Sequence, residues 1–259
     1  MSATPAPAPV TAPSGRARDR MTSQARFETH TLLANGEQLV VSVVLPALAL
    51  VAMALTTSPD LGPGRRIDVV MPGVLALAIV STAFTGQAIA TGFDRRYGVL
   101  RLFGVTPLGR SGLLAGKAVA VLVVVLVQTV ILVVIGLCLG WHPNLPGIAL
   151  AVVFGLLGCW TWVALALLLA GTLRAEAVLA VANLVWVLLA ALGGLLYPTD
   201  RMPDAAGHIV SLIPSGALGD GLRAALTGHD GSTLLPLAVL VVWGCVATAL
   251  TARTFKWSD

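Results

Sequence analysis

Charge is the property that this sequence has least of. Only 11% of its 259 residues are Asp, Glu, Lys or Arg, whereas 57% are hydrophobic, and the mean hydropathy is +0.90. A soluble domain carries about 25% charged residues, so the composition excludes an ordinary soluble domain and indicates a membrane protein. The net charge is a small +4, and the basic residues stand between apolar runs. They are therefore expected to set membrane topology rather than to bind nucleic acid.

Cysteine and histidine are also scarce. The three Cys lie inside apolar runs and the four His show no ligand spacing, which excludes a disulfide framework and a metal site. The first apolar run begins only near Leu39, so we expect no cleaved signal peptide. Residues 1–23 are rich in Ala and Pro and are expected to form a disordered tail. One membrane domain is expected to follow over residues 24–255.

Six apolar stretches are long enough to cross a bilayer, which takes about 20 residues. No charged residue lies in the central turns of any of them. The predicted fold class is therefore an all-α membrane protein with six transmembrane helices. The spans are expected at about residues 39–56, 69–92, 113–139, 148–170, 177–196 and 234–252.

The distribution of Lys and Arg predicts the orientation. Six spans place both termini on one side, and twelve of the sixteen basic residues fall on that side, in the N-terminal segment, residues 93–117, the Arg174 loop and the C-terminal tail. Because basic residues favour the cytoplasmic side, we expect both termini and residues 94–117 to be cytoplasmic. The expected location is the cytoplasmic (plasma) membrane.

Two further segments carry helical patterns outside the spans. Before the first span, Phe27, Leu32 and Leu33 stand among polar residues, which predicts an N-terminal amphipathic helix on the membrane surface. Residues 197–232 form a long, half-apolar loop in which Pro203 and Pro214 can each open a short helix. In the second of these helices one face is apolar and Asp220 can pair with Arg223. We expect an outer re-entrant helical hairpin before the last span, with an ordinary folded loop as the alternative.

The segment "DRRYGVLRLFGVTPLGRSGLLAGK" (residues 94–117) holds five basic residues and ends in Gly116-Lys117. It is not a phosphate-binding loop, whose pattern is G-x-x-x-x-G-K-[ST]. Ser111 stands where the first Gly belongs, and Ala118 replaces the hydroxyl residue that would hold Mg²⁺. This chain is therefore not expected to hydrolyse ATP.

The same segment carries a helical pattern followed by a turn. An apolar face recurs at helical spacing from Tyr97 to Gly104, with basic residues beside it, and Thr106-Pro107 ends it because a residue before proline avoids the α conformation. A positive, aromatic-bearing cytoplasmic helix is a surface that a soluble partner can grip. Anchoring the topology alone would explain the charge but not this pattern.

At these residues the sequence resembles the membrane subunits of ABC-2-type ATP-binding cassette exporters. Members carry a loop between spans two and three close to R-x-Y/E-G-x-L-x-x-L-x-x-T-P-L-x-R-x-x-L-x-G-K. It stands here from Arg95 to Leu102, then at Thr106–Arg110, and then at Leu114 and Gly116-Lys117. The segments 34–46 and 197–226 also resemble the family's approach to its first span and its outer hairpin. Many members have Glu where Tyr97 stands, so a role for that acid does not carry over.

The resemblance implies a half-transporter. Two permease subunits, identical or different, would pair in the membrane, and each would dock on a separate subunit that binds ATP and Mg²⁺, while this chain binds no cofactor and is not catalytic alone. The loop would transmit the motion of the ATPase to the spans. The residues expected at that contact are Phe27, Arg95, Arg96, Tyr97, Gly98, Leu100, Arg101, Thr106, Pro107, Leu108 and Arg110.

The spans hold few polar side chains that could meet a substrate. Gln87, Gln128, Asn183 and Trp186 are the candidates, although buried amides also commonly join helices. The lack of charge favours a lipophilic or amphiphilic cargo. It argues against a gradient-driven secondary transporter, which needs ionisable residues at mid-membrane. A lipid-modifying enzyme would need a catalytic cluster that we do not find. A non-transporting scaffold of an ABC complex stays open.

Overall fold

The structure is a computed structural model. It describes residues 40–58, 60–61, 64–100, 109–228 and 232–255, together with Thr22, Arg26 and His30. At residues 40, 41, 109–111, 113 and 114 it describes the backbone alone. Every regular element in these ranges is a helix, which confirms the all-α fold class.

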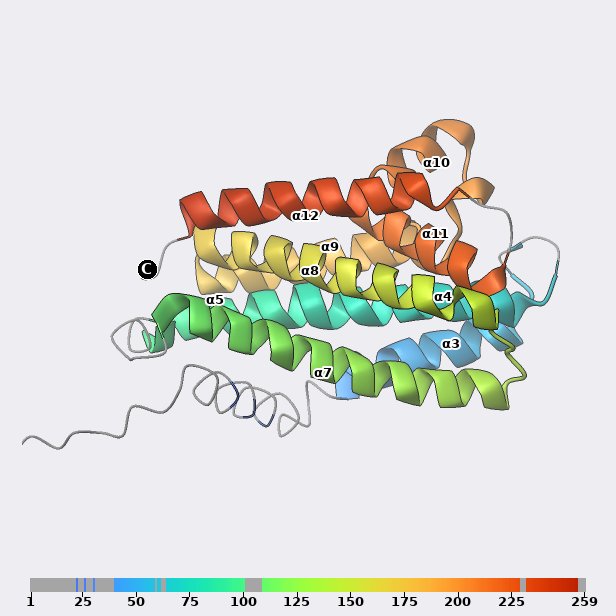
Figure 1. The fold of residues 1–259 in the computed structure, drawn as a ribbon, viewed down its shortest axis with the longest axis horizontal. Coiled ribbons are helices and arrows are strands. Elements are labelled where there is room, and N and C mark those ends of the chain that lie inside the picture. The colour runs from blue at the N-terminus through green and yellow to red at the C-terminus, as the bar shows by residue number, and fades with distance from the viewer. Residues whose placement is uncertain are drawn as a thin grey trace, which may run out of the picture.

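The helices lie side by side in one elongated bundle (Figure 1). In chain order they are η1 (Val40–Val44), α3 (Leu45–Leu55), α4 (Arg66–Val80), η2 (Ser81–Gly86), α5 (Gln87–Arg96), α7 (Gly109–Cys138), η3 (Leu145–Gly147), α8 (Ile148–Thr172), α9 (Ala175–Leu192), η4 (Thr199–Arg201), α10 (Asp204–Ser211), α11 (Pro214–Thr227) and α12 (Leu234–Thr254).

Five helices in the described part of the chain are long and apolar enough to cross a membrane. They run over Arg66–Arg96, Ala115–Cys138, Leu145–Thr172, Ala175–Leu192 and Leu234–Thr254, and each matches an expected span. The first expected span is short in its described part. The helical residues described there, Val40–Leu55, rise about 24 Å at about 1.5 Å each, less than the ~30 Å of hydrocarbon in a bilayer, and Leu39 lies outside the described residues. The expectation of six full spans is therefore supported for five.

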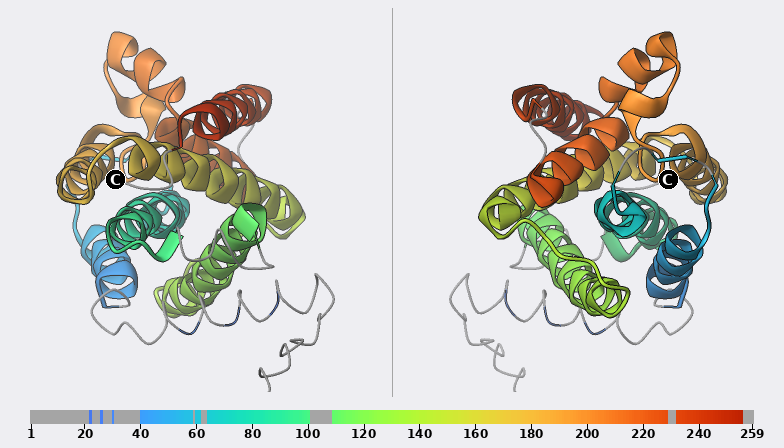
Figure 2. Two further views of the ribbon diagram at one scale, coloured as in Figure 1. Left: turned by 90° about the vertical axis from the view of Figure 1, so that its left-hand side faces the viewer. Right: turned by 90° about the vertical axis from the view of Figure 1, so that its right-hand side faces the viewer.

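The helix over Arg66–Arg96 is the central rod of the bundle. It joins α4, η2 and α5 without a break, and 83% of its apolar window is buried, against 17% for α9. The middle of the rod, η2, is a π-helical segment, and its hydroxyl residues Ser81 and Thr82 form hydrogen bonds with neighbouring helices. Views along the bundle show the other long helices arranged around this rod (Figure 2).

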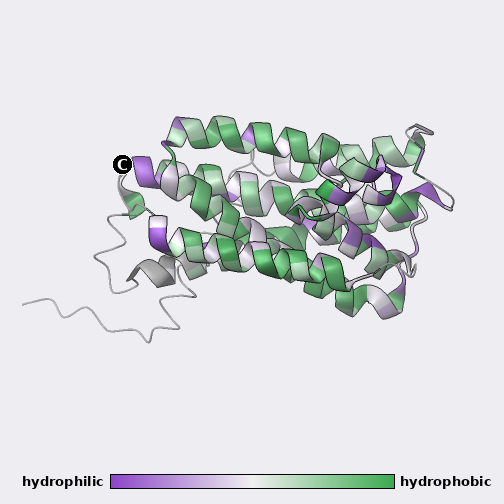
Figure 3. Ribbon diagram, turned by 90° about the horizontal axis from the view of Figure 1, so that it is seen from above, coloured by the Kyte–Doolittle hydropathy of each residue, from purple (hydrophilic) through white to green (hydrophobic). Residues whose placement is uncertain are grey.

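The two ends of the bundle differ in what they carry. One end, called the loop end below, holds the C-terminal end of α5, the start of α7, the α8–α9 turn and the C-terminal end of α12 (Figure 1). The other, called the hairpin end, holds α10 and α11 and the start of α4. Hydrophobic residues dominate the lengths of the helices, while hydrophilic residues gather toward the two ends (Figure 3). This distribution suits a bundle whose middle lies in hydrocarbon.

The hairpin before the last span forms as two helices, as the sequence predicts. Pro214 occupies the first turn of α11, and Pro203 directly precedes α10. The apolar face of α11 is buried against α4, α8 and α12, whereas Ile209 in α10 and Leu212 after it are 64% and 56% exposed. Helix α10 stands out from the bundle in Figure 2. How deep this pair sits in a membrane stays a prediction.

The expected N-terminal amphipathic helix lies largely outside the described residues. Thr22, Arg26 and His30 are helical and exposed, and Phe27 is not described.

Glycines allow α8 and α11 to pack closely. A Cβ at Gly158 would approach Leu218 Cδ1 to 2.7 Å, and a Cβ at Gly221 would overlap the ring of the fully buried Phe154. These contacts hold the hairpin against the bundle through van der Waals packing, which is the main attraction between helices in lipid.

We predict that Gly221→Ala lowers the thermal unfolding temperature of the detergent-solubilised protein by roughly 2–10 °C, because overpacking a tight contact costs about 1–3 kcal/mol. The matched control is Gly155→Ala in α8, where the nearest side-chain atom to a new Cβ is Ile79 Cδ1 at 4.0 Å. The control is expected to leave the unfolding temperature unchanged or to raise it. Equal shifts for both variants would contradict the packing account.

Candidate functional site

Three consecutive residues at the end of α5 bind three different helices. Asp94 bonds Lys117 of α7, Arg95 bonds the end of α8, and Arg96 bonds Glu176 of α9. A helix turns about 100° per residue, so neighbouring side chains point in different directions and can reach separate partners. These contacts join four helices at the loop end.

Arg95 lies inside the bundle. Only 4% of its surface is exposed, and its Nη1 donates to the carbonyl of Ala170 at 2.7 Å while its Nη2 donates to the carbonyl of Leu173. The last carbonyls of a helix have no partner within the helix, and a cation near them is favoured by the helix dipole. Arg95 thus caps α8. Arg95 was expected at the partner contact, whereas its guanidinium is engaged within the chain.

The two ion pairs of α5 differ in exposure. Lys117 Nζ lies 2.6 Å from Asp94 Oδ2, and their side chains are 5% and 29% exposed. The side chains of Arg96 and Glu176 are 45% and 64% exposed. An exposed pair contributes little because water and salt screen it, whereas breaking a buried pair leaves an uncompensated charge. The Asp94–Lys117 pair is therefore the stronger constraint.

The helix expected in the loop is interrupted at Gly98, where the sequence pattern predicts a continuous helix. Helix α5 continues to Arg96, and a turn follows in which Gly98 adopts the left-handed conformation, with φ of 72°. Glycine takes this conformation without a steric penalty, so it readily ends a helix. Arg95 and Arg96 consequently belong to the second span rather than to a separate loop helix.

Tyr97 is the exposed aromatic residue of this turn. Its side chain is 72% exposed, its ring stacks on Phe93 with centroids 6.1 Å apart, and the Arg96 guanidinium lies 6.0 Å from its centroid. A cation at this distance interacts favourably with the ring face. Three residues later, Leu100 is fully buried. The turn thus presents a supported aromatic ring to the outside.

The remaining predicted contact residues cannot be placed. Arg101, Thr106, Pro107 and Leu108 lie outside the described residues, and Arg110 is described only as backbone at the start of α7.

Two of the predicted substrate residues are buried and hydrogen-bonded within the bundle. Gln128 is fully buried; it accepts a hydrogen bond from Thr82 at 2.9 Å and donates one to the carbonyl of Ser42 at 3.0 Å. It therefore joins α7 to η2 and η1, which matches the alternative that buried amides join helices. Gln87 is also buried and donates to Thr91 at 3.0 Å, within α5.

The other two lie on α9. Trp186 donates from Nε1 to the Ser81 hydroxyl at 2.6 Å, which fixes α9 to the π-helical segment. Asn183 is exposed, and so are its neighbours Leu184 and Val187, at 60% and 54%. An amide on such an apolar face is unfavourable against lipid tails. Asn183 is therefore the predicted substrate residue that the fold leaves accessible.

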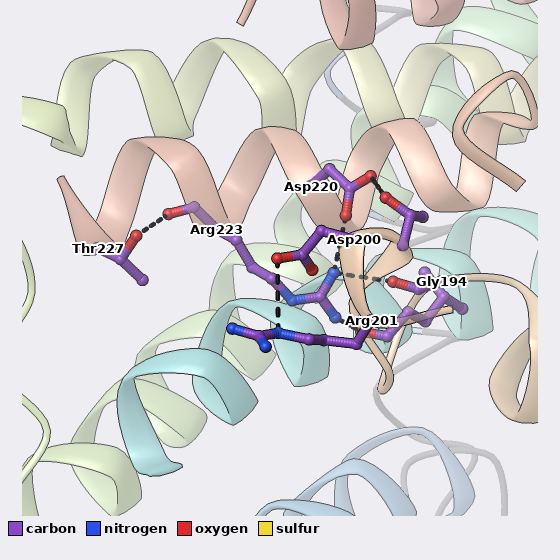
Figure 4. Close-up of polar contacts among 8 residues, drawn as sticks. Gly194, Asp200, Arg201, Asp220, Arg223 and Thr227 are labelled. Carbon is purple, nitrogen blue, oxygen red and sulfur yellow. Dashed lines mark hydrogen bonds and ion pairs between the residues drawn. The ribbon is translucent and has the colours of Figure 1, made fainter. Parts of the chain in front are cut away.

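A second charged cluster lies at the hairpin end (Figure 4). Arg223 of α11 is 8% exposed; its Nη1 donates to the carbonyl of Gly194 at 2.9 Å and to Asp220 Oδ1 at 3.2 Å, and its Nη2 donates to the carbonyl of Leu195. Asp220 also accepts a hydrogen bond from Thr199. Burial raises the pKa of the Asp220 carboxyl, although Thr199 and Arg223 oppose the shift. The Asp220–Arg223 pairing confirms the sequence prediction.

The carbonyl contacts of Arg223 could not be predicted from the sequence. Gly194 lies 29 residues away along the chain and has a left-handed φ of 76°, which turns the backbone after α9 toward α11. No sequence pattern marks a backbone carbonyl as a ligand for a distant arginine.

Long apolar helices with charges confined to their ends define an α-helical integral membrane protein. The chain belongs to the ABC-2 family of transporter proteins, whose family model matches residues 65–253. The match begins before α4 and ends within the last turn of α12, so it covers all five long helices, the loop and the hairpin. Members of this family are membrane components of ABC transporters and generally pair with an ATP-binding subunit. No curated protein matches the chain by sequence.

We predict that Arg223→Met destabilises the hairpin end by about 3–5 kcal/mol, because it leaves the partly buried Asp220 without its charge partner and the carbonyls of Gly194 and Leu195 without their donor. The measurement is the thermal unfolding temperature in detergent. The control is Arg201→Met, which removes a 39% exposed side chain paired with Asp200 at 3.6 Å, and its effect is expected to stay within about 1 kcal/mol. A larger loss for Arg201→Met than for Arg223→Met would refute the assignment.

Proposed function

We propose that this chain is the permease subunit of an ABC exporter. It moves a lipophilic or amphiphilic substrate across the cytoplasmic membrane, using ATP hydrolysed with Mg²⁺ on a separate subunit. Family membership supports the transporter class. The observation that carries the coupling to an ATPase is the turn after α5, where a rigidly held helix end presents the exposed ring of Tyr97.

The geometry of that turn suits a protein contact. Contacts from Arg95 and Arg96 hold the end of α5 against α8 and α9, and Phe93 and Arg96 support the Tyr97 ring. An aromatic ring that is already ordered loses little entropy on binding, which is why such residues dominate interface energetics. The basic residues beside it would meet an acidic surface on the ATP-binding subunit.

The topology follows the distribution of basic residues. The loop end gathers Arg95, Arg96, Lys117, Arg174 and Arg253, and the sequence adds the N-terminal arginines to the same side. The loop end and both termini are then cytoplasmic. This assignment requires α3 to complete a sixth crossing. The C-terminal end of α3 lies beside the start of α4, where Arg66 Nε donates a hydrogen bond to the carbonyl of Met53.

A secondary transporter lacks support in the described residues. It needs ionisable groups at mid-membrane, whereas the buried polar groups in the middle of the rod and in α7 opposite it are Thr82, Gln87 and Gln128. A non-transporting scaffold would share the docking turn with an exporter. ATP-dependent transport by the purified complex would distinguish an exporter from such a scaffold.

The chain has two tyrosines, and comparing the effect of replacing each one tests the proposed docking turn. Tyr97→Ala is expected to reduce the affinity for the ATP-binding subunit about tenfold or more, because an exposed aromatic anchor is lost. The subunit is identified by its P-loop sequence after co-purification from the native membrane, and affinity is then measured with the purified proteins. Reversing the charge of Arg95 is a poorer test, since Arg95 caps α8.

Tyr197→Ala, at the hairpin end, is the matched control and is expected to leave that affinity unchanged. Retention of full affinity by Tyr97→Ala, or the absence of any co-purifying ATPase, would contradict the proposed docking turn.

We further propose that two permease chains pair through the α9 face that carries Asn183. In a background with Cys138, Cys159 and Cys245 replaced by Ala, Asn183→Cys is expected to form an oxidative cross-link between two chains in native membranes. The control is Val242→Cys on α12, which is 59% exposed and is expected to face lipid. Cross-linking of Val242→Cys alone would place the pairing face on α12 instead.

A further inference from the structure

We propose that the Asp94–Lys117 ion pair is a mechanical joint, through which movement of the loop between α5 and α7 reaches the membrane helices. This inference rests on the proposed function, since it assigns how the motion of an ATPase would enter the bundle. Asp94 and Lys117 are positioning residues in it: they contact neither nucleotide nor cargo.

The pair closes the base of the loop. Asp94 and Lys117 are 23 residues apart in sequence, yet their side chains meet at 2.6 Å, one near the end of α5 and the other in the third turn of α7. The segment of residues 95–116 therefore begins and ends at this contact. A force on the loop therefore displaces the ends of α5 and α7 together rather than separating them.

The burial of Lys117 makes this pair difficult to break. Its side chain is 5% exposed, so an ammonium without Asp94 would be left in a position with little access to water. The neighbouring Arg96–Glu176 pair is exposed at both partners and does not impose the same constraint. Between these two pairs, Arg95 ties α5 to the last carbonyls of α8.

The central rod carries the displacement to the other end. It runs from Arg66 to Arg96 without a break in the helix, with the π-helical segment η2 at its middle, so it connects the two ends of the bundle directly. At the hairpin end the rod passes closely under Arg223 and Leu195: a Cβ on Gly73 would lie 2.9 Å from Arg223 Nη2 and would overlap the Leu195 carbonyl. The joint and the hairpin anchor thus contact the same helix at opposite ends.

Cys138 provides a native reporter of this transmission. It is the last residue of α7, it is exposed, and it lies at the opposite end of that helix from Lys117. With Cys159 and Cys245 replaced by Ala, Cys138 becomes the single thiol of the chain. Its rate of labelling by a membrane-impermeant maleimide then reports the environment of the far end of α7.

The experiment uses the complete complex with its ATP-binding subunit in lipid nanodiscs. Labelling of Cys138 is compared without nucleotide and with Mg-ATP and vanadate. We expect the wild-type joint to give a nucleotide-dependent change in rate of about fivefold or more, the usual lower range of coupling between distant sites. Asp94→Asn is expected to abolish most of this change while the complex still assembles and hydrolyses ATP. The charge swap Asp94→Lys with Lys117→Asp is expected to restore it.

The matched control is Asp68→Asn, at the hairpin end of the same rod. Asp68 is 30% exposed and pairs with Arg65, against 29% for Asp94, so an equal charge is removed at equal exposure. This control is expected to keep the nucleotide response.

The outcomes separate the joint from the proposed function. Failure of wild type to bind an ATPase would refute the exporter assignment and the joint with it. Assembly and ATP hydrolysis by wild type without any change at Cys138, or an undiminished change in Asp94→Asn, would overturn the joint alone. If Asp94→Asn does not fold, the charge swap decides, because a restored pair with no nucleotide response also overturns the proposal.

Discussion

A buried arginine bound to backbone carbonyls closes this bundle at each end. Hydrocarbon offers no partner to a carbonyl, so a helix end or a turn near the membrane must find its donors within the protein. Arg95 supplies them to the end of α8, and Arg223 supplies them to the turn after α9. Each guanidinium has several donors in a fixed plane, which lets it serve two carbonyls at once. The positions of α8, α9 and α11 depend on these two contacts.

Both arginines contact the central rod, so one helix connects the two ends of the bundle. Arg95 belongs to the rod itself, and Arg223 packs over its Gly73. Along the middle of the rod the outer helices are held by few polar ties, such as Gln128 to Thr82 and Trp186 to Ser81, within otherwise apolar surfaces. A buried central helix with sparsely tied outer helices suits a protein whose helices shift against one another. The exposed apolar face of α9, with its isolated Asn183, is the surface of this arrangement that most needs a partner other than lipid.

Much of the fold could be read from the sequence because hydrophobic length alone predicts a membrane helix. Five spans, the two short helices of the hairpin and the Asp220–Arg223 pair follow from local patterns of three to about twenty residues. The first span, expected at 39–56, is helical over Val40–Leu55, which is a short crossing for a bilayer. The loop helix was extended too far toward its N-terminus, because helical spacing through Tyr97 and Leu100 conceals the break that Gly98 introduces. The role of this region in binding a partner stays a prediction, and within it Arg95 and Arg96 are bonded to α8 and α9.

The class of protein, the apolar helices and the concentration of basic residues between residues 94 and 117 can all be recognised without a structure. These properties are local, and each is encoded by neighbouring residues. Which of those basic residues face inward depends on how distant helices pack. Arg95, Arg96 and Tyr97 are adjacent and similar in pattern, yet one caps α8, one reaches α9 and one is exposed. The physical reason is that each residue turns the helix by about 100°, so its role depends on which distant helix packs on that side.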